Sequence, residues 1–376
     1  MKFDNKECVR CIMGTRWDQS IEFDDNGVCN HCLRYDELVG SRVFSGEEGN
    51  QQLDELVKKI KISGKGKKYD CIIGVSGGVD STYVAYLACK LGLRPLAVHF
   101  DNGWNSKLAV ENIEKTLSKL GIDLDTHVVD WDEFSDLQLS FLKASVPDGE
   151  IPTDHGIDAL LWQKASDYGV KYILSGMNFA TEALSVPDWA YGHSDWRYIK
   201  DIHQKYGSLK LSNFPHFGFL KLFLHNAVFG LRIVSPLNYV DYNKAEAMLI
   251  LQKELGWTYY GGKHYESIYT RFFQGYVLPK KFGIDKRAGH LSDLINSGQL
   301  TKKEALEEME KTAYDPVLLS EDLAYVKKKF RISDSDWDAI MQAPVKNFRD
   351  FKNSYNFVQF LRRSVNKLRA FGLYPR

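Results

Sequence analysis

The sequence has no excess of charge of either sign. Lys and Arg together number 49 among its 376 residues, and Asp and Glu also number 49. Proteins that bind a long nucleic acid usually have more Lys and Arg than Asp and Glu, because neutralising the phosphates supplies much of the binding free energy. We therefore expect a small-molecule substrate and no nucleic-acid partner.

Long apolar runs are missing as well. No run reaches the roughly 18 residues that a membrane-spanning helix needs. Residues 1–10 are polar, where a secretory signal would carry an apolar stretch. Hydrophobic residues at 44% and charged residues at 26% are ordinary values for a globular protein. We expect a cytoplasmic protein with no membrane partner.

Cysteine is scarce, and four of the six cysteines lie within the first 32 residues. They form two Cys-x-x-Cys pairs separated by residues 12–28, a spacing typical of a Cys₄ zinc ribbon. Four thiolates leave no open coordination position, so we predict a structural zinc ion. Two disulfides or an iron–sulfur cluster are the alternatives, and the reducing cytosol argues against the disulfides. The predicted zinc ligands are Cys8, Cys11, Cys29 and Cys32.

Apolar, strand-like runs alternate with helical stretches in the middle of the chain. Strands are expected at residues 69–76, 95–100, 125–130 and 170–176, and helices at 80–91, 106–120 and 156–169. Such alternation predicts right-handed crossovers and an α/β fold with a doubly wound parallel sheet. The expected divisions are a zinc ribbon at 1–40, a linker with a lead-in helix at 41–68, the α/β domain at 69–256, and a mainly helical region at 257–376.

An aromatic segment interrupts the α/β domain at about residues 187–230. It lacks strand periodicity, so we expect an insertion at the carboxyl edge of the sheet. Its composition suggests the hypothesis that this segment shapes a sugar pocket, so that replacing Trp189 or Trp196 would weaken sugar binding more than ATP binding.

The sequence SGGVDS begins at Ser76, directly after the first expected strand, and opens a helix. Gly77 and Gly78 let the backbone turn sharply and approach a ligand without a Cβ in the way. The N–H groups of the turn and of the helix N-terminus then face an anion, and Ser76 and Ser81 add hydroxyl donors. Asp80 cannot bind phosphate directly, so we expect it to cap the helix or to hold a metal ion. The pattern indicates a phosphate loop, with an ordinary glycine-rich turn as the alternative.

This loop resembles the PP-loop of the N-type ATP pyrophosphatases, which include GMP synthetase, asparagine synthetase, NAD synthetase and the tRNA thiolases. HFDNGW at residues 99–104 is similar to the segment after the second strand of GMP synthetase. Residues 235–256 have the Pro-Leu…Lys-x-Glu…Leu-Gly layout that is common in the class. The resemblance implies an enzyme that cleaves ATP between its α and β phosphates and adenylates a carbonyl oxygen. A nitrogen or sulfur nucleophile then displaces AMP.

A narrower resemblance covers nearly the whole chain. The cysteine pairs, the loop and four further motifs resemble, in the same order, the bacterial N-acetyl sugar amidotransferases. These enzymes act on nucleotide-activated sugars destined for surface polysaccharides such as the O-antigen of lipopolysaccharide. The resemblance implies that ammonia converts the adenylated N-acetyl group into an acetamidino group. The motifs are IPTDHGID at 151–158, SGMNFATE at 175–182, DWRYIKDIH at 195–203, and the segment 261–287.

The ATP site is expected beyond the carboxyl ends of the strands, as in other open α/β sheets. Asp80 and Asp101 are candidates to hold Mg²⁺ on the pyrophosphate of ATP. For Asp101, which precedes Asn-Gly, a turn-forming role explains the sequence nearly as well. The other residues expected at ATP are Ser76, Gly77, Gly78, Ser81, Gly176, Asn178 and Lys281.

The candidate catalytic residues are Asp80, Asp154, His155 and Glu182. Asp154 and His155 lie where a loop is expected to open a helix, and they could position a substrate or transfer a proton. The alternatives are an N-cap role for Asp154 and a first-turn helix position for Glu182. The residues expected at the sugar nucleotide are Asp158, Lys263, His264 and Arg271, of which the resemblance supports the last three.

Ammonia is expected to come from another protein. The sequence begins Met1-Lys2, which gives no N-terminal cysteine nucleophile, and Cys71 and Cys89 lie in apolar segments typical of core thiols. The resemblance implies a separate glutaminase and a barrel-shaped, ammonia-conducting subunit like those of histidine biosynthesis. Two other functions remain open: a PP-loop tRNA thiolase and a non-catalytic nucleotide-binding scaffold. The thiolase would need an extra catalytic cysteine or iron–sulfur site and a basic face.

Overall fold

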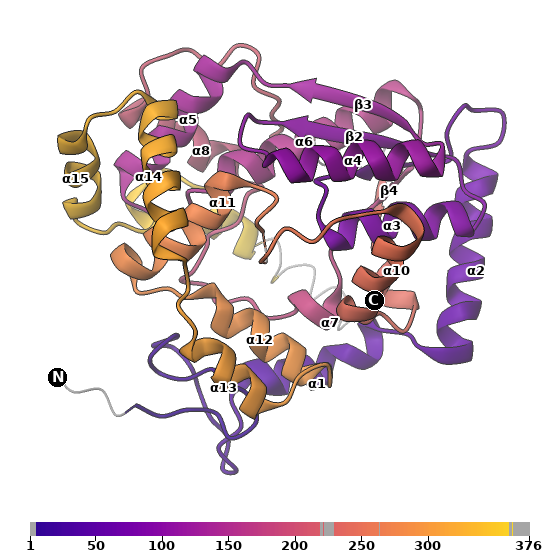
Figure 1. Cartoon of the computed structure of the whole chain (residues 1–376), viewed down its shortest axis with the longest axis horizontal. Helices are drawn as coiled ribbons and strands as arrows, with labels where there is room; N and C mark the ends of the chain where they lie inside the picture. Colours follow the sequence, from indigo (N-terminus) through magenta and orange to yellow (C-terminus); the bar gives the residue numbers. More distant parts are fainter. Residues whose placement is uncertain (1–4, 219–220, 222–228, 263, 361–362, 364–376) are drawn as a thin grey trace.

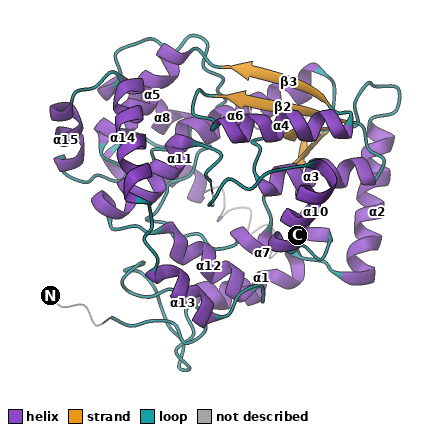
Figure 2. Cartoon of the chain, in the orientation of Figure 1, coloured by secondary structure: helices purple, strands orange, loops and turns teal. Residues whose placement is uncertain are grey.

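The computed structural model describes residues 5–218, 221, 229–262, 264–360 and 363. Five parallel strands form one sheet in the order β3-β2-β1-β4-β5, with helices on both faces (Figures 1 and 2). This arrangement confirms the predicted doubly wound α/β fold. The strands are β1 Cys71–Gly74, β2 Pro95–Asp101, β3 Asp123–Val128, β4 Tyr172–Leu174 and β5 Arg232–Val234.

The strands divide their side chains between two cores, because neighbouring residues of a strand point to opposite faces. Cys71 and Ile73 of β1 pack into one core, and Ile72 packs into the other. The helices of the first core are α2 Gly46–Ser63, α3 Val79–Lys90, α4 Lys107–Leu120 and α10 Lys244–Leu255. Those of the second include α5 Trp131–Ala144, α6 Ile151–Asp167 and α8 Trp196–Tyr206.

Local signals explain where most of these elements begin and end. The Ser106 side chain accepts a hydrogen bond from the Ala109 N–H and caps α4, which ends before Gly121 at a φ of 65°. The helix α6 begins five residues earlier than expected, because Pro152 occupies its first turn, where a proline fits. Asp154 is therefore inside a helix and does not cap it. The strand β5 was not expected from the sequence.

The N-terminal segment consists of a tight turn at residues 7–14, which we call the knuckle, and, further along, a helix. Glu7 and Gly14 form an isolated antiparallel bridge around the first cysteine pair. The second pair lies at the start of α1 (Asn30–Arg42), with Cys29 as the N-cap residue and Cys32 in the first turn. The N-terminal four-cysteine unit is thus present as predicted, with a helix following directly after Cys29.

The chain after β5 is helical in the part that the structure describes, as expected. It packs against both the sheet and the N-terminal segment, and α12 and α13 lie beside α1 (Figure 1). None of the described helices has the length and apolar character needed to cross a membrane. The helices are η1 Pro236–Tyr239, α11 Ile268–Phe272, the π-helix η2 Phe273–Phe282, α12 Lys286–Asn296, α13 Lys302–Glu310, α14 Pro316–Phe330, α15 Asp334–Gln342 and η3 Phe348–Asp350.

Candidate active site

The loop between β1 and α3 has the geometry of an anion-binding turn. Gly77 has a φ of 80°, and a Cβ at this position would lie 2.5 Å from the Ala109 carbonyl oxygen, so only glycine fits. Gly78 is the N-cap residue of α3, and the first turn of that helix lines a cavity. The hydroxyl oxygens of Ser76 and Ser81 lie 3.3 Å apart on the loop. The N-terminal end of α3 and the helix dipole therefore favour an anion in this cavity.

Two residues from a distant segment hold Asp80. The Tyr242 hydroxyl donates to Asp80 Oδ1, and Lys244 Nζ lies 3.0 Å from Asp80 Oδ2. Burial lowers the pKa of Lys244, but the Asp80 carboxylate outweighs burial, and the net pKa is raised. Asp80 does not cap α3, because Gly78 is the N-cap, so the capping alternative is wrong. A fixed ammonium group therefore stands beside the loop.

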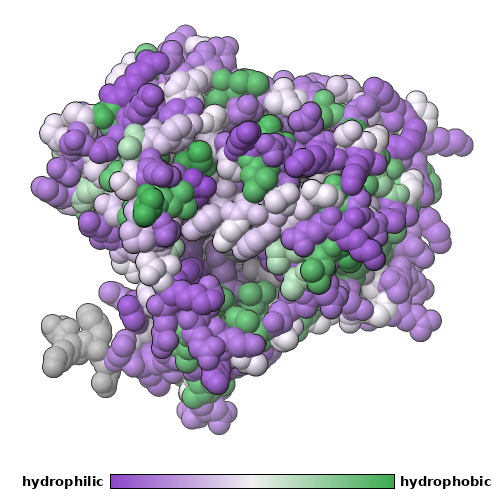
Figure 3. All heavy atoms as spheres, viewed as in Figure 1, coloured by the Kyte–Doolittle hydropathy of each residue, from purple (hydrophilic) through white to green (hydrophobic). Residues whose placement is uncertain are grey.

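Two adjoining cavities open at the carboxyl ends of the strands. The larger cavity has a volume of about 630 Å³ and is lined by the phosphate loop and Lys244. The smaller, of about 500 Å³, is bounded by the ends of β1, β2 and β4 and by α6. Figure 3 shows this face of the molecule hollowed near its centre. The residues that line both cavities are Ser76, Gly176, His264, Glu266, Gln274, Lys286 and His290.

Five of these seven shared residues come from the chain after residue 262. The C-terminal region therefore forms the wall opposite the carboxyl ends of the strands. Lys286 Nζ lies 2.8 Å from Glu150 Oε2, and the Gln274 side chain donates to the same carboxylate at 2.9 Å. Burial lowers the pKa of Lys286, but the Glu150 carboxylate outweighs burial and raises it overall. Lys286 is therefore a fixed cation at the junction, where phosphate charge would be neutralised.

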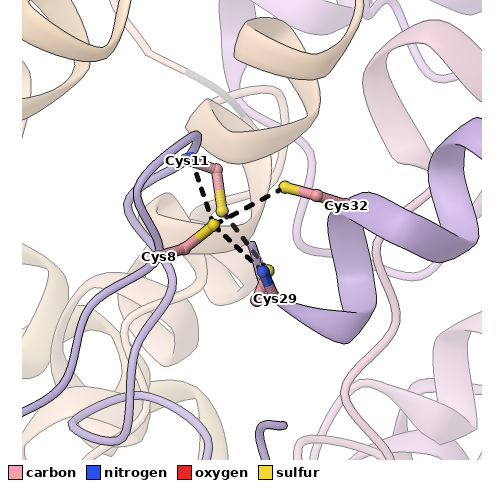
Figure 4. A group of neighbouring side chains, drawn as sticks. All are labelled: Cys8, Cys11, Cys29 and Cys32. Atoms are coloured by element: carbon pink, nitrogen blue, oxygen red, sulfur yellow. Dashed lines mark hydrogen bonds between the residues drawn. The ribbon is translucent and has the colours of Figure 1, made fainter. Parts of the chain in front are cut away.

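The four N-terminal cysteines converge (Figure 4). All four sulfur atoms lie within 4.8 Å of one another, with 4.0 Å between Cys8 and Cys32 and 3.7 Å between Cys11 and Cys29. Sulfurs bound tetrahedrally at about 2.3 Å from zinc lie about 3.8 Å apart, so the group fits a zinc ion. A disulfide would need about 2.05 Å. His31 is not part of the group, because its Nε2 pairs with a buried aspartate at 2.8 Å.

Two family models match the two halves of this site. Residues 266–363 match the model described as LPS biosynthesis protein WbpG-like, C-terminal domain. Residues 70–157 match the model of queuosine biosynthesis protein QueC and include the phosphate loop. Residues 70–157 are therefore similar to a PP-loop family, and residues 266–363 are similar to the WbpG-like C-terminal domain.

Curated relatives cover the chain to different extents. An uncharacterized protein of Methanocaldococcus jannaschii is 23% identical over 316 residues, which are 81% of this chain and 93% of that protein. A glutamine-hydrolyzing GMP synthase of Pyrobaculum aerophilum is 40% identical over 74 residues. That match spans 19% of this chain and only 14% of the synthase. It is confined to one part of each protein.

Solved structures of low similarity also align. The NMN synthetase from Francisella tularensis covers 77% of this chain and 98% of its own, at 16% identity and a TM-score of 0.39. A predicted subunit of tRNA methyltransferase from Methanocaldococcus jannaschii covers 48% of this chain and 74% of its own, at 15% identity and a TM-score of 0.29. These scores are too low to add to the argument from strand order.

The fold brings many of the site residues predicted from the sequence to the two cavities. A Cβ on Gly176 would lie 2.9 Å from the Ser81 nitrogen, so this glycine lets its loop pack on the phosphate loop. Lys263 lies outside the described residues. The expected residues that line the larger cavity are Ser76, Gly78, Asp80, Ser81, Gly176, Glu182, His264 and Arg271, and those of the smaller include Asp154 and Asp158. Their roles remain predictions.

Two residues expected at ATP form a turn and a cap instead. Asp101 Oδ1 accepts a hydrogen bond from the Gly103 N–H at 3.0 Å, which makes it the turn former of the Asn-Gly sequence. Asn178 is the N-cap of the short helix α7 (Phe179–Glu182), and its Oδ1 accepts from the Thr181 N–H at 3.0 Å. Neither residue lines the two cavities in the described part of the chain, so their contacts with ATP stay predictions.

His155 and Lys281 also have structural roles. His155 is fully buried, its Nδ1 donates to the His193 carbonyl at 2.7 Å, and its Nε2 accepts from the Phe217 N–H at 3.3 Å. Burial lowers its pKa to about 4, so the neutral ring is saturated with hydrogen bonds, and its prediction as a catalytic residue is wrong. Lys281 donates to the Ala343 carbonyl at 3.2 Å, at the C-terminal end of α15. Its prediction as an ATP ligand is wrong too.

The aromatic segment builds core and does not line the cavities in the part of the chain that is described. Trp189 is 8% exposed, and its Nε1 donates to the Trp17 carbonyl at 3.0 Å. Trp196 stacks on His155 at 5.4 Å and on His216 at 4.2 Å between ring centroids. These two tryptophans therefore have packing roles, and residues 219–220 and 222–228 of the segment lie outside the described residues.

Two of the residues expected at the sugar nucleotide have constrained conformations. His264 lines both cavities and has a φ of 63°, a left-handed conformation that is uncommon outside glycine. Arg271 forms two hydrogen bonds to the Asp322 carboxylate, at 2.6 Å and 2.7 Å, so its guanidinium is fixed in the cavity wall.

Asp154 lies in α6 at the smaller cavity, facing charges from Glu150, Asp158, Lys286 and His193. Its side chain is exposed to the open cavity, and partial desolvation by the surrounding protein raises its pKa to about 6. His193 Nε2 lies 2.9 Å from Asp158 Oδ2. Burial lowers the pKa of His193, but Asp158 and Asp154 outweigh burial and raise it to about 9. A base that titrates near neutrality beside a cation is suited to proton transfer.

We expect Asp154→Asn to raise the melting temperature at pH 8 while slowing turnover. The folded-state pKa of about 6 lies above the ordinary value of 3.8, so the folded protein binds this proton more tightly than the unfolded chain does. The ionised carboxylate therefore costs stability above pH 6, and the cost disappears below about pH 4. Melting temperatures measured between pH 4 and pH 8 should converge at the acid end.

The matched control for this change is Asp158→Asn, which should destabilise the protein at pH 8 because it removes the partner of His193. A melting temperature for Asp154→Asn at or below that of the wild type at pH 8 would contradict the raised pKa.

Proposed function

We propose that this chain is an ATP-dependent amidotransferase that converts the N-acetyl group of a nucleotide-activated sugar into an acetamidino group. The product would enter a surface polysaccharide such as the O-antigen. The observation that carries the proposal is the joining of a PP-loop and a WbpG-like C-terminal domain around two connected cavities. The loop supports cleavage of ATP to AMP, and the WbpG-like match supports lipopolysaccharide biosynthesis.

In the proposed reaction the amide oxygen of the N-acetyl group attacks the α-phosphorus of ATP, and pyrophosphate leaves. Ammonia then adds to the imidate carbon, the nitrogen loses a proton, and AMP departs with the former amide oxygen. The loop N–H groups, Lys244 and Lys286 would neutralise the phosphate charge that develops. Asp154 would accept the proton from the nitrogen as the carbon–nitrogen bond forms. Mg²⁺ would add charge neutralisation at the pyrophosphate.

Ammonia is proposed to come from a separate glutaminase through a barrel-shaped, ammonia-conducting subunit. The cysteines support this, because a glutaminase of the usual kinds needs a reactive cysteine. Four of the six form the metal-binding group, which we propose holds structural zinc. Cys71 is fully buried in the first core, where burial raises the pKa of its thiol, and Cys89 packs against the same core.

The proposed function is tested by measuring AMP and pyrophosphate release from ATP with Mg²⁺ and ammonium across a panel of UDP-N-acetyl sugars. The expected result is AMP release that depends on one sugar, and a product whose mass shows that an NH group has replaced an oxygen. If AMP is released with bulk tRNA and a sulfur donor but with none of the sugars, the chain is a tRNA thiolase and the amidotransferase proposal is wrong. Nucleotide binding without AMP release in either assay would indicate the scaffold.

A further inference from the structure

Three carboxylates lie near the lysine beside the phosphate loop. Lys244 interacts electrostatically with those of Asp80, Glu182 and Glu266, which come from three separate segments. ATP phosphates at the loop would add further negative charge. A divalent cation would reduce the repulsion between the phosphates and these carboxylates, and PP-loop chemistry implies Mg²⁺.

The residues present fit Mg²⁺ as a companion of ATP more than as a resident ion. Within the described residues, the group of metal-binding side chains that converges on one point is the cysteine group, and the three carboxylates do not form a ready-made cage. This suits Mg²⁺, which is usually held by one or two carboxylates together with substrate phosphates and water. The question is which carboxylate supplies the protein ligand.

Glu266 shows the clearest sign of a missing cation. Its Oε2 is buried and has no hydrogen-bond partner, while its Oε1 lies 3.5 Å from His264 Nδ1. A buried carboxylate oxygen without a donor is costly, and such atoms usually mark an ion or a water.

Glu266 lies next to the part of the loop where the ATP phosphates are expected to bind. A Cβ on Gly78 would lie 3.4 Å from Glu266 Oε1, so the carboxylate lies against the N-cap residue of α3, where an anion binds. Glu266 also lines both cavities. A carboxylate in this place would repel ATP unless a cation separates it from the phosphates. Asp80, by contrast, is already paired with Lys244 at 3.0 Å.

We propose that Glu266 Oε2 is a ligand of the Mg²⁺ ion that accompanies ATP. The first residue of the WbpG-like match thereby completes the metal site of the PP-loop half. The proposal rests on the ATP use in the proposed function, and it is independent of which acceptor is modified.

The test uses Mn²⁺ as a probe, because Mn²⁺ prefers oxygen ligands and does not report on the cysteine group. Free Mn²⁺ is measured by electron paramagnetic resonance in the presence of α,β-methylene-ATP, which the enzyme cannot cleave between the α and β phosphates. Glu266→Gln is expected to weaken Mn²⁺ binding in the ternary complex by about tenfold or more. The matched control is Glu321→Gln, an exposed residue of α14 that should leave Mn²⁺ affinity unchanged.

Equal Mn²⁺ affinity in folded Glu266→Gln and wild-type protein would overturn the proposal. If Glu266→Gln does not fold, Glu266→Asp keeps the charge and withdraws the ligand, and an unchanged Mn²⁺ spectrum in its ternary complex would overturn the proposal equally. If none of the sugars gives AMP, the proposed amidotransferase function is wrong, but the Mn²⁺ measurement still tests Glu266. The two failures are therefore distinguishable.

Discussion

Replacing Lys244 with methionine is expected to slow AMP formation by about 10²–10³-fold, the usual effect of removing one preorganised charge at a developing transition state. Lys244 lines the larger cavity beside the phosphate loop, with its Nζ 3.0 Å from Asp80 Oδ2. Without the ammonium group, the carboxylates of Asp80, Glu182 and Glu266 would lose a positive charge that separates them from ATP. The measurement is the rate of pyrophosphate release at saturating ATP, with ATP affinity measured separately by calorimetry.

The matched control is Lys253→Met, which makes the same change on an exposed position of the same helix. This variant should keep the wild-type rate. Because Asp80 would lose its partner in Lys244→Met, the fold must be checked by circular dichroism before the rates are compared. A folded Lys244→Met protein with a rate within threefold of the wild type would show that Lys244 serves only to hold Asp80.

Loss of the metal from the cysteine group is expected to lower the melting temperature by about 10 °C or more. The four sulfurs are fully buried, and without an ion their thiolates would repel one another. The knuckle also supports the larger cavity, because Lys302 of α13 donates to the Cys8 carbonyl at 2.6 Å and pairs with Glu7 at 2.9 Å. Arg287 of the adjoining helix α12 lines that cavity. Substrate affinity should therefore fall with stability.

The change to make is Cys11→Ser, with Cys89→Ala as the matched control, because Cys89 lies outside the group. Mass spectrometry should find one zinc per wild-type and Cys89→Ala chain and less than one in Cys11→Ser. Melting curves before and after chelation give the stability. A chelated protein that stays folded and binds ATP normally, yet releases no AMP, would contradict a structural role and place the metal in catalysis.

Short-range patterns accounted for much of the fold and for two parts of the site. SGGVDS was recognisable because the two glycines, the serines and the helix start are adjacent in sequence and act through local backbone geometry. The cysteine pairs were recognisable because zinc fixes their spacing. The strand β5 was missed because it has three residues, two of them exposed, and follows the aromatic segment without a clear turn signal.

Residue roles were harder to predict than elements. Asp154 and His155 are neighbours, and the sequence offered both as catalytic residues. An α-helix turns about 100° per residue, so the two side chains leave α6 in different directions. Asp154 faces the smaller cavity, whereas His155 is buried between Trp196 and Phe217. The sequence could not separate them, because the start of α6 was placed five residues too late.

The sequence by itself determined the class of chemistry, the parallel α/β scaffold and the cysteine group, since each depends on residues that lie close together along the chain. Only the tertiary structure decided which charges surround the loop. Lys244, Glu266 and Lys286 lie far from Asp80 in sequence, and in a linear reading they resemble ordinary helix or loop charges. They become a site because the helices after β5 fold back over the carboxyl ends of the strands, where burial and mutual charge fix their ionisation.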